Sequence, residues 1–274
     1  MSPSWRDRYA AVLRPDRVDL VRQRRGWKPA LDLKQSRPVP AEDEGPAWLG
    51  AVSALRDLLA AETAAGGELT VLLSNHFVRY QLIPWDENVT SIAEFDSYGR
   101  IAFEGIFGDA ARTWAIRISR ERPGAARLAS AIDADLQDAL SQFRIGGLRL
   151  VSVQPYLMAA FNRLGKPFRR RDFCFVLAEP GRVCILAAVG GQWRTVRSHA
   201  INDEAEISPL VERELRLLET GEGPLPPLYF HAPGFGHLRL PLVNGMAPHA
   251  LDLPAAIGFS PLADQAYAMA VAGA

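Results

Sequence analysis

Two short stretches of this sequence decide its fold: VLRPDRV at residues 12–18 and VLAEPGRV at residues 176–183. In each stretch an apolar run leads into a turn that contains Pro and Arg, and a second apolar run follows. Proline presets φ at the start of a tight turn, and glycine supplies a positive φ where one is needed. Each stretch therefore predicts a β-hairpin, so the chain contains a similar hairpin twice.

The segments after the two hairpins repeat in the same order. Each hairpin is followed by a Gly turn with a tryptophan, Trp27 or Trp193, and by a third strand. A helix is then predicted at residues 46–62 and at residues 207–223, because apolar side chains recur there at helical spacing and glycines follow. Further strands are predicted at residues 69–74 and 226–234. We therefore expect two α/β lobes built on one plan.

The stretch between the two lobes predicts a small α/β insert in the first lobe. Strands are expected at residues 78–85 and 112–119, and a helix is expected within residues 88–108. Residues 126–143 are predicted to form one helix, because Leu128, Ile132, Leu136, Leu140 and Phe143 fall on one helical face. The expected boundaries are 1–84 with 148–168 for the first lobe, 85–147 for the insert, and 169–274 for the second lobe.

Composition narrows the class of protein. Lys and Arg together number 31, as do Asp and Glu, so the formal net charge is zero and nothing indicates a nucleic-acid partner. No apolar run approaches the length of a membrane span, and no signal peptide is evident, so we expect a cytosolic chain. Cys174 and Cys184 fall in predicted strands and are expected to be buried free thiols. The five scattered histidines fit no zinc motif, so no metal is expected.

This order of elements, with LTVLLSNHFVRYQLIPW at residues 69–85 and LRLVSVQPYLMAAFNR at residues 148–163, resembles the actin-like ATPase fold. In that ribonuclease H-like fold, duplicated lobes each hold a mixed sheet with helices. The resemblance is to the branch of PilM, MshI and the cytoplasmic part of GspL. It implies a non-catalytic cytoplasmic scaffold, peripheral at the inner membrane, in a type IV pilus or type II secretion platform. The implied partners are the cytoplasmic N-terminal segment of a bitopic membrane protein and an assembly ATPase, and dimerisation stays open.

The resemblance also implies a cleft for ATP, in which glycine-rich turns let backbone N–H groups reach the phosphates. Here Pro15 and Pro180 remove a donor from each hairpin turn, and Pro233 interrupts a third loop. We therefore expect a degenerate nucleotide cleft, no catalytic residue and no cofactor, with Mg·ATP as the disfavoured alternative. The residues expected at this cleft are Arg14, Asp16, Arg17, Glu179, Gly181, Arg182, Gly234 and Gly236.

A second candidate site lies where the insert begins. Phe77, Arg79, Tyr80 and Trp85 cluster in SNHFVRYQLIPW, and they belong either to the core or to a groove for an extended partner peptide. Two other functions stay open. An active actin-like ATPase or sugar-kinase-type phosphotransferase would need intact phosphate turns and a general-base Asp. An adaptor with an unrelated partner would need neither.

Overall fold

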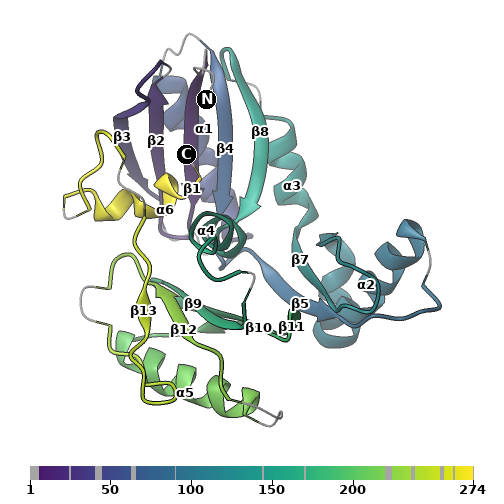
Figure 1. Ribbon diagram of the computed structural model, residues 1–274. Coiled ribbons are helices and arrows are strands. Elements are labelled where there is room, and N and C mark those ends of the chain that lie inside the picture. Colours follow the sequence, from purple (N-terminus) through teal and green to yellow (C-terminus); the bar gives the residue numbers. More distant parts are fainter. Residues whose placement is uncertain are drawn as a thin grey trace. The chain divides into compact units, whose positions relative to one another are not determined.

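A computed structural model of the protein describes residues 6–24, 26–40, 45–62, 66–89, 91–143, 145–169, 171–219, 224–235, 238–253, 256–261 and 263–273 (Figure 1). The chain divides into two compact units. Unit 1 comprises residues 1–77, 135–163 and 253–274, and unit 2 comprises residues 78–134 and 164–252. Each unit is described by itself below.

Unit 1 contains a five-stranded sheet in the order β3-β2-β1-β4-β8. β1 is antiparallel to β2 and parallel to β4, and β4 is parallel to β8. The strands are β1 (Asp7–Leu13), β2 (Arg17–Arg24), β3 (Ala30–Pro38), β4 (Gly67–Leu73) and β8 (Leu148–Pro155). The helices are α1 (Trp48–Ala61), α3 (Ala134–Ser141) and α4 (Tyr156–Leu164). The predicted first hairpin, third strand, helix and strand are all present.

The C-terminal segment completes unit 1. A short 3-10 helix (Gln265–Tyr267) leads into α6 (Ala268–Val271), whose four residues are buried. The Leu31 N–H donates to the Ile257 carbonyl at 2.8 Å, and the Lys34 ammonium lies 2.7 Å from an Asp264 carboxylate oxygen. These contacts attach Ile257 and Asp264 to β3.

Unit 2 contains a second five-stranded sheet in the order β11-β10-β9-β12-β13. The strands are β9 (Phe173–Glu179), β10 (Arg182–Val189), β11 (Gln192–Ala200), β12 (Leu228–His231) and β13 (His249–Ala250), and the helix α5 (Ile207–Leu218) follows a 3-10 turn (Glu204–Glu206). All seven residues of β9 are buried, as expected for a central strand covered on both faces.

The two sheets share one topology. In each, an antiparallel hairpin and third strand occupy one side, and a parallel strand lies beside the first hairpin strand. The order 3-2-1-4-5 of unit 1 recurs in unit 2 when its strands are numbered from β9. The duplication predicted from the hairpin motif is therefore confirmed at the level of strand order.

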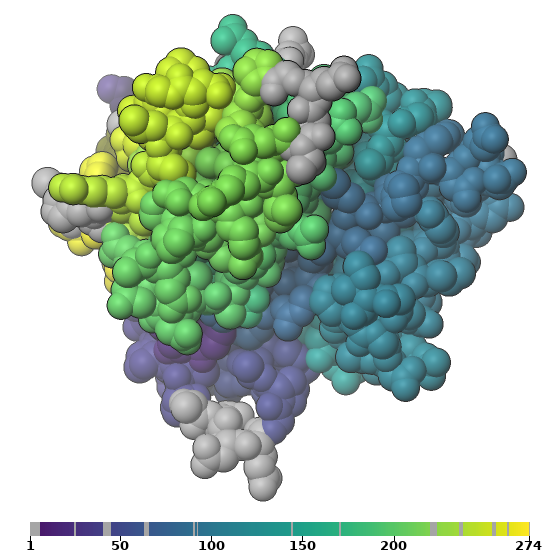
Figure 2. All heavy atoms as spheres, turned by 90° about the horizontal axis from the view of Figure 1, so that it is seen from below, coloured from purple at the N-terminus to yellow at the C-terminus, as the bar shows by residue number. Residues whose placement is uncertain are grey.

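The insert belongs to unit 2 and contains a separate three-stranded sheet in the order β5-β7-β6. Its elements are β5 (Arg79–Ile83), α2 (Ile92–Phe107), a 3-10 helix (Gly108–Thr113), β6 (Trp114–Ile118) and β7 (Arg127–Asp133). A capping box starts α2, since the Ser91 and Glu94 side chains each accept a hydrogen bond from the other's backbone N–H. In Figure 2 the insert, in blue to teal, lies at the surface beside the green atoms of the rest of unit 2.

The prediction of a single helix over residues 126–143 is wrong. Its first half forms β7, the central strand of the insert sheet, and only Ala134–Ser141 is helical. The cause is that Leu128 and Ile132 are four residues apart, a spacing that fits one face of a helix and one face of a strand equally well. Pairing with both β5 and β6 resolves the ambiguity in favour of the strand.

Cys174 and Cys184 are buried free thiols, as predicted. They do not face each other, because Cys174 lies opposite Ala187 and Cys184 opposite Leu177. Burial raises the pKa of both thiols to about 12, so they are inert in the folded protein. Among the described residues, no helix is long and apolar enough to cross a membrane.

Candidate functional site

The first hairpin turn holds its arginines in local ion pairs. The Arg14 guanidinium donates two hydrogen bonds to Asp16, at 3.1 and 2.9 Å. Arg17 donates from Nε to both oxygens of Asp19 at 3.0 Å, and Asp19 is fully buried. Ser36 adds a hydrogen bond to Asp19 at 2.7 Å. Because both guanidinium groups already bind carboxylates two residues away in the sequence, this turn offers little to a phosphate.

The second hairpin turn has the same length and different chemistry. Pro180 and Gly181 form its tip, and Gly181 has a φ of 77°, the conformation required at the third position of a type II turn. Glu179 is 1% exposed at the end of β9. Arg182 is half-buried and forms no ion pair within the described part of the chain, and its Nε is a buried donor without an acceptor. Unlike Arg17, Arg182 therefore has no ion-pair partner among the residues that the structure describes.

The structure brings together two residues that the sequence assigned to different sites. Arg79, on β5, was predicted for the partner groove, and Arg182, on β10, for the nucleotide cleft. Burial lowers the pKa of Arg79, and the nearby positive charge of Arg182 lowers it further. Unit 2 therefore holds two half-buried guanidinium groups whose positive charges act on each other.

The third predicted loop follows β12. Gly234 has a φ of 96° with open space around its Cα, whereas Gly236 lies outside the described residues. His231, at the end of β12, is buried, and its Nδ1 lies 2.8 Å from the Leu251 carbonyl. Burial lowers the pKa of His231, so the ring is neutral and belongs to the core. The described residues contain no group of three or more His, Cys, Asp or Glu side chains placed to hold a metal.

The partner-groove residues divide between the two units. Phe77 ends a segment of unit 1 and is half-buried, while the other three belong to unit 2. Tyr80 is only 8% exposed, so its ring serves mainly as core. Trp85 packs on Phe95 of α2, with ring centroids 5.8 Å apart. Within unit 2, Arg79 and Trp85 are therefore the groove candidates with the most accessible side chains.

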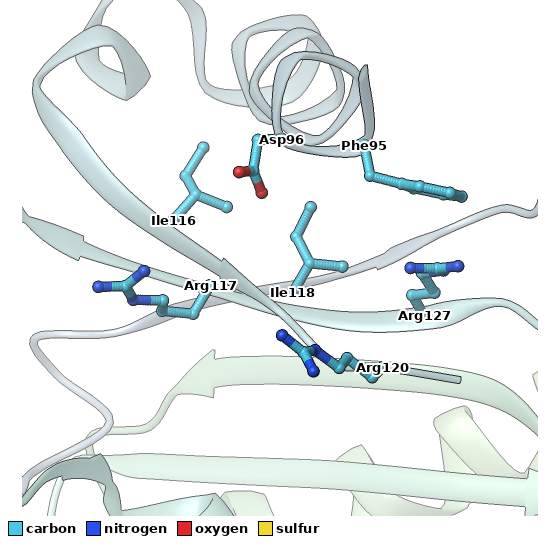
Figure 3. A pocket seen from close by; sticks show the side chains of 7 residues that line it. All are labelled: Phe95, Asp96, Ile116, Arg117, Ile118, Arg120 and Arg127. Carbon is cyan, nitrogen blue, oxygen red and sulfur yellow. The ribbon is translucent and has the colours of Figure 1, made fainter. Parts of the chain in front are cut away.

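Sequence reasoning missed a cavity of 230 Å³ in the insert, between α2 and β6 (Figure 3). Three arginines, two isoleucines, an aspartate and a phenylalanine line it: Arg117, Arg120, Arg127, Ile116, Ile118, Asp96 and Phe95. The available signal was RISRERPGAAR, residues 117–127, in which four arginines accompany one glutamate. That glutamate, Glu121, accepts hydrogen bonds from Ser119 and from Trp193 of β11.

No protein-family model and no curated protein matches this sequence. Solved structures do match it. The chain is similar to a structure of the PilM–PilN type IV pilus biogenesis complex, with a TM-score of 0.68 and 15% identity over 97% of this chain and 96% of the other. The cytoplasmic domain of EpsL, an inner-membrane component of the type II secretion system of Vibrio cholerae, gives a TM-score of 0.59 and 13% identity, covering 95% and 94%.

A third matching structure is described by the name of its fold. It is a Bacteroides thetaiotaomicron protein with an actin-like ATPase fold and unknown function, with a TM-score of 0.52 and 10% identity over 84% of this chain and 82% of the other. This chain has the actin-like ATPase fold. The resemblance to PilM and to the cytoplasmic part of GspL-type proteins, inferred from the order of strands and helices, is thus confirmed as a similarity of structure.

Proposed function

We propose that this protein is a non-catalytic cytoplasmic scaffold of a type IV pilus or type II secretion inner-membrane platform. The observation that carries the proposal is the likeness to the PilM–PilN complex, which extends over 97% of the chain and includes both lobes and the insert. The likeness to the cytoplasmic domain of EpsL, over 95% of the chain, points to the same class of assembly.

The chemistry of the two hairpin turns supports a scaffold without turnover. A phosphate site needs backbone N–H groups that converge on the anion, and Pro15 and Pro180 each remove one. Arg14 and Arg17 bind Asp16 and Asp19, so a phosphate would have to compete with carboxylates that are already in place. These features disfavour the alternative of an active ATPase or sugar-kinase-type phosphotransferase.

The partner in this proposal is the cytoplasmic N-terminal segment of a bitopic inner-membrane protein. Arg79 and Trp85 of unit 2 would contact it, because their side chains are the more accessible ones. A backbone carbonyl or carboxylate of the segment beside Arg79 would be attracted by the positive charges of Arg79 and Arg182. An assembly ATPase is a further candidate partner.

The decisive experiment is a titration of this protein with a synthetic peptide. The peptide is the cytoplasmic N-terminal segment of a bitopic inner-membrane platform protein from the same organism, and the readout is isothermal calorimetry. Arg79→Glu should weaken binding about tenfold or more, because it reverses the charge at the centre of the groove. Lys28→Glu changes the same charge at an exposed position of unit 1 and serves as the matched control.

The outcomes separate the three functions. Equal affinity for Arg79→Glu and the wild type, in protein shown to be folded by circular dichroism, would remove the groove. A Tm raised by several degrees with millimolar Mg·ATP would instead favour the nucleotide-binding alternative, since a ligand at 100 times its Kd adds about 2.7 kcal/mol. Binding to none of the platform peptides, together with no Tm shift, would favour the adaptor with an unrelated partner.

A further inference from the structure

The insert sheet has an unpaired edge. In the order β5-β7-β6, β6 is the outer strand, and β7 is its one strand partner within the described part of the chain. An edge strand with alternating apolar residues presents backbone donors and acceptors to any extended chain that approaches it. β6 has this pattern, since Trp114, Ile116 and Ile118 face the insert core.

The hydrogen bonds at the two ends of β6 show which residues point outward. The Ser119 N–H donates to the Leu128 carbonyl at 2.8 Å, so odd-numbered residues bond to β7. At Trp114 the N–H donates to the Ala111 carbonyl, and the carbonyl accepts from Arg100 at 3.4 Å. Alternation then directs the N–H and C=O groups of Ile116 and Ile118 to the free edge. These four groups are placed to form backbone hydrogen bonds with a short strand added at this edge.

Positive side chains flank the free edge. In Figure 3, Ile116 and Ile118 point from β6 toward α2, while Arg117 and Arg120 extend on the other side of the strand. Both arginines are exposed, and neither forms an ion pair with any residue that the structure describes. Asp96, on α2, is the one acidic residue that lines the cavity, against three arginines.

The third arginine is held in place by aromatic rings. The Arg127 guanidinium carbon lies 3.6 Å from the centre of the Phe95 ring and 5.5 Å from that of Trp85. Stacking of this kind fixes the guanidinium plane and leaves its N–H edge directed outward. The buried Nε of Arg127 has no acceptor among the described residues. A ligand that fills the cavity with an acceptor atom would satisfy this donor.

We propose that the free edge of β6 binds an extended segment of a partner protein in which apolar and acidic side chains alternate. Successive side chains of an added strand point to opposite faces. One set would enter the cavity over Ile116 and Ile118, and the other set would meet Arg117 and Arg120. This surface is separate from the proposed groove at Arg79 and does not depend on the platform role.

A second copy of this chain does not suit the same edge. If two β6 strands paired with each other, Arg117 and Arg120 of both copies would lie close together, and like charges across a strand pair are destabilising. An acidic partner removes that repulsion. Asp96 gives a distinctive prediction. Its carboxylate lies on the cavity face, where it repels the net negative charge of the bound segment, so its removal should help binding.

The test uses the full chain and a fluorescein-labelled peptide of about six residues in which valine and glutamate alternate. Fluorescence anisotropy gives the Kd at fixed ionic strength. The double variant Arg117→Glu, Arg120→Glu should weaken binding about tenfold or more, because it reverses two contacting charges. Asp96→Asn should tighten binding. Amide hydrogen exchange should slow at Ile116 and Ile118 when the peptide is bound.

Arg122→Glu is the matched control, since Arg122 is an exposed arginine of the same loop that does not line the cavity. It should leave the Kd within about twofold. Three results would overturn the proposal: equal losses in Arg122→Glu and the double variant, weaker binding in Asp96→Asn, or no added protection at Ile116 and Ile118. Complete displacement of the peptide by inorganic phosphate or by phosphatidylglycerol vesicles at matched ionic strength would also overturn it, by assigning the site to simple anions.

Discussion

The two hairpins have the same backbone and different polar chemistry. We refer to β1–β3 as copy 1 and β9–β11 as copy 2. Arg14 pairs with Arg17 across the first turn, and Glu179 pairs with Arg182 across the second. This register places Pro15 with Pro180 and Arg17 with Arg182.

Two positions beyond the turn, the copies diverge. Copy 1 has Asp19, which lies opposite Ser36 on β3, and copy 2 has Cys184, which lies opposite Ser198 on β11. In copy 1 the serine and Arg17 both donate to the buried carboxylate. In copy 2 the thiol lies 3.5 Å from the Ser198 hydroxyl, so no carboxylate stands at the position equivalent to Asp19. The difference at this one position separates the ion-paired Arg17 from Arg182, which forms no ion pair with the residues that the structure describes.

The largest expected difference in stability is between variants in which one of the two equivalent arginines is replaced by alanine. Arg17→Ala leaves the fully buried Asp19 without its cation, and we expect a loss of about 3 kcal/mol in the free energy of unfolding. Arg182→Ala breaks no ion pair among the described residues, and we expect a loss under about 1 kcal/mol. Urea denaturation of both variants measures the contrast. Losses of equal size would show that the two arginines have equivalent environments.

Introducing at Cys184 the aspartate found at the equivalent position of copy 1 tests directly whether this residue accounts for the difference between the two arginines. Cys184→Asp should place a carboxylate beside Arg182, as Asp19 lies beside Arg17. We expect a favourable coupling of about 1 kcal/mol or more between the introduced carboxylate and Arg182 in a double-mutant cycle that uses Cys184→Asp and Arg182→Ala. The readout is again the free energy of unfolding in urea. A coupling near zero would mean that the strand geometry of copy 2 cannot form the pair.

Substitutions at the tips of the two turns should change the free energy of unfolding by smaller amounts. Gly181 occupies a left-handed conformation at φ 77°, so Gly181→Ala should lower the free energy of unfolding by about 1 kcal/mol or more. Asp16, at the equivalent position of copy 1, has no positive φ. Asp16→Ala removes only a partly exposed ion pair with Arg14 and should cost about 0.5 kcal/mol. Thermal melts of the two variants rank the effects, and the reverse order would contradict the assigned turn types.

The smallest expected difference between the two copies is in how stability depends on pH. Burial lowers the pKa of His199 below its ordinary value of 6.5, although the Glu214 carboxylate, 3.3 Å away, partly offsets the shift. The folded protein therefore resists protonation of His199 while the unfolded chain takes up the proton, so stability falls as pH drops below about 6.5. The equivalent position of copy 1 is Arg37, so this histidine is a feature of copy 2.

His199→Gln should remove part of this loss, under about 1 kcal/mol between pH 7 and pH 5. The measurement is the free energy of unfolding of variant and wild type at several pH values. His231 is also buried with a lowered pKa and is unchanged in both proteins, so the difference isolates His199. Parallel pH profiles for the two proteins would contradict the prediction.

Local signals in the sequence were sufficient for the parts of the fold that depend on neighbouring residues. The turns at Pro15 and Pro180 and the apolar runs beside them predicted both hairpins, because turn chemistry and strand alternation act over a few residues. The glycines after the two main helices marked their ends. The repeat of these signals in one order predicted the duplicated lobes and the resemblance to PilM-like proteins.

Local sequence signals gave a wrong prediction where a helix and a strand fit the same pattern. The stretch from Leu128 to Phe143 has a spacing that suits a helix throughout, yet its first half is the central strand of the insert. The choice depends on β5 and β6, which pair with it from both sides and satisfy its backbone groups. No local pattern contains that information, because the partners come from other parts of the chain.

The sequence by itself determined the order of elements, the duplication and the loss of glycine-rich turns, since each is written in consecutive residues. Only the tertiary structure decided which charges are neutralised. Arg17 and Arg182 are equivalent in sequence context, but one meets a carboxylate two residues along its own strand and the other meets Arg79 from the insert. It also decided that β6 is left at an edge beside three arginines, because edges and cavities arise only when strands from separate segments pair and pack.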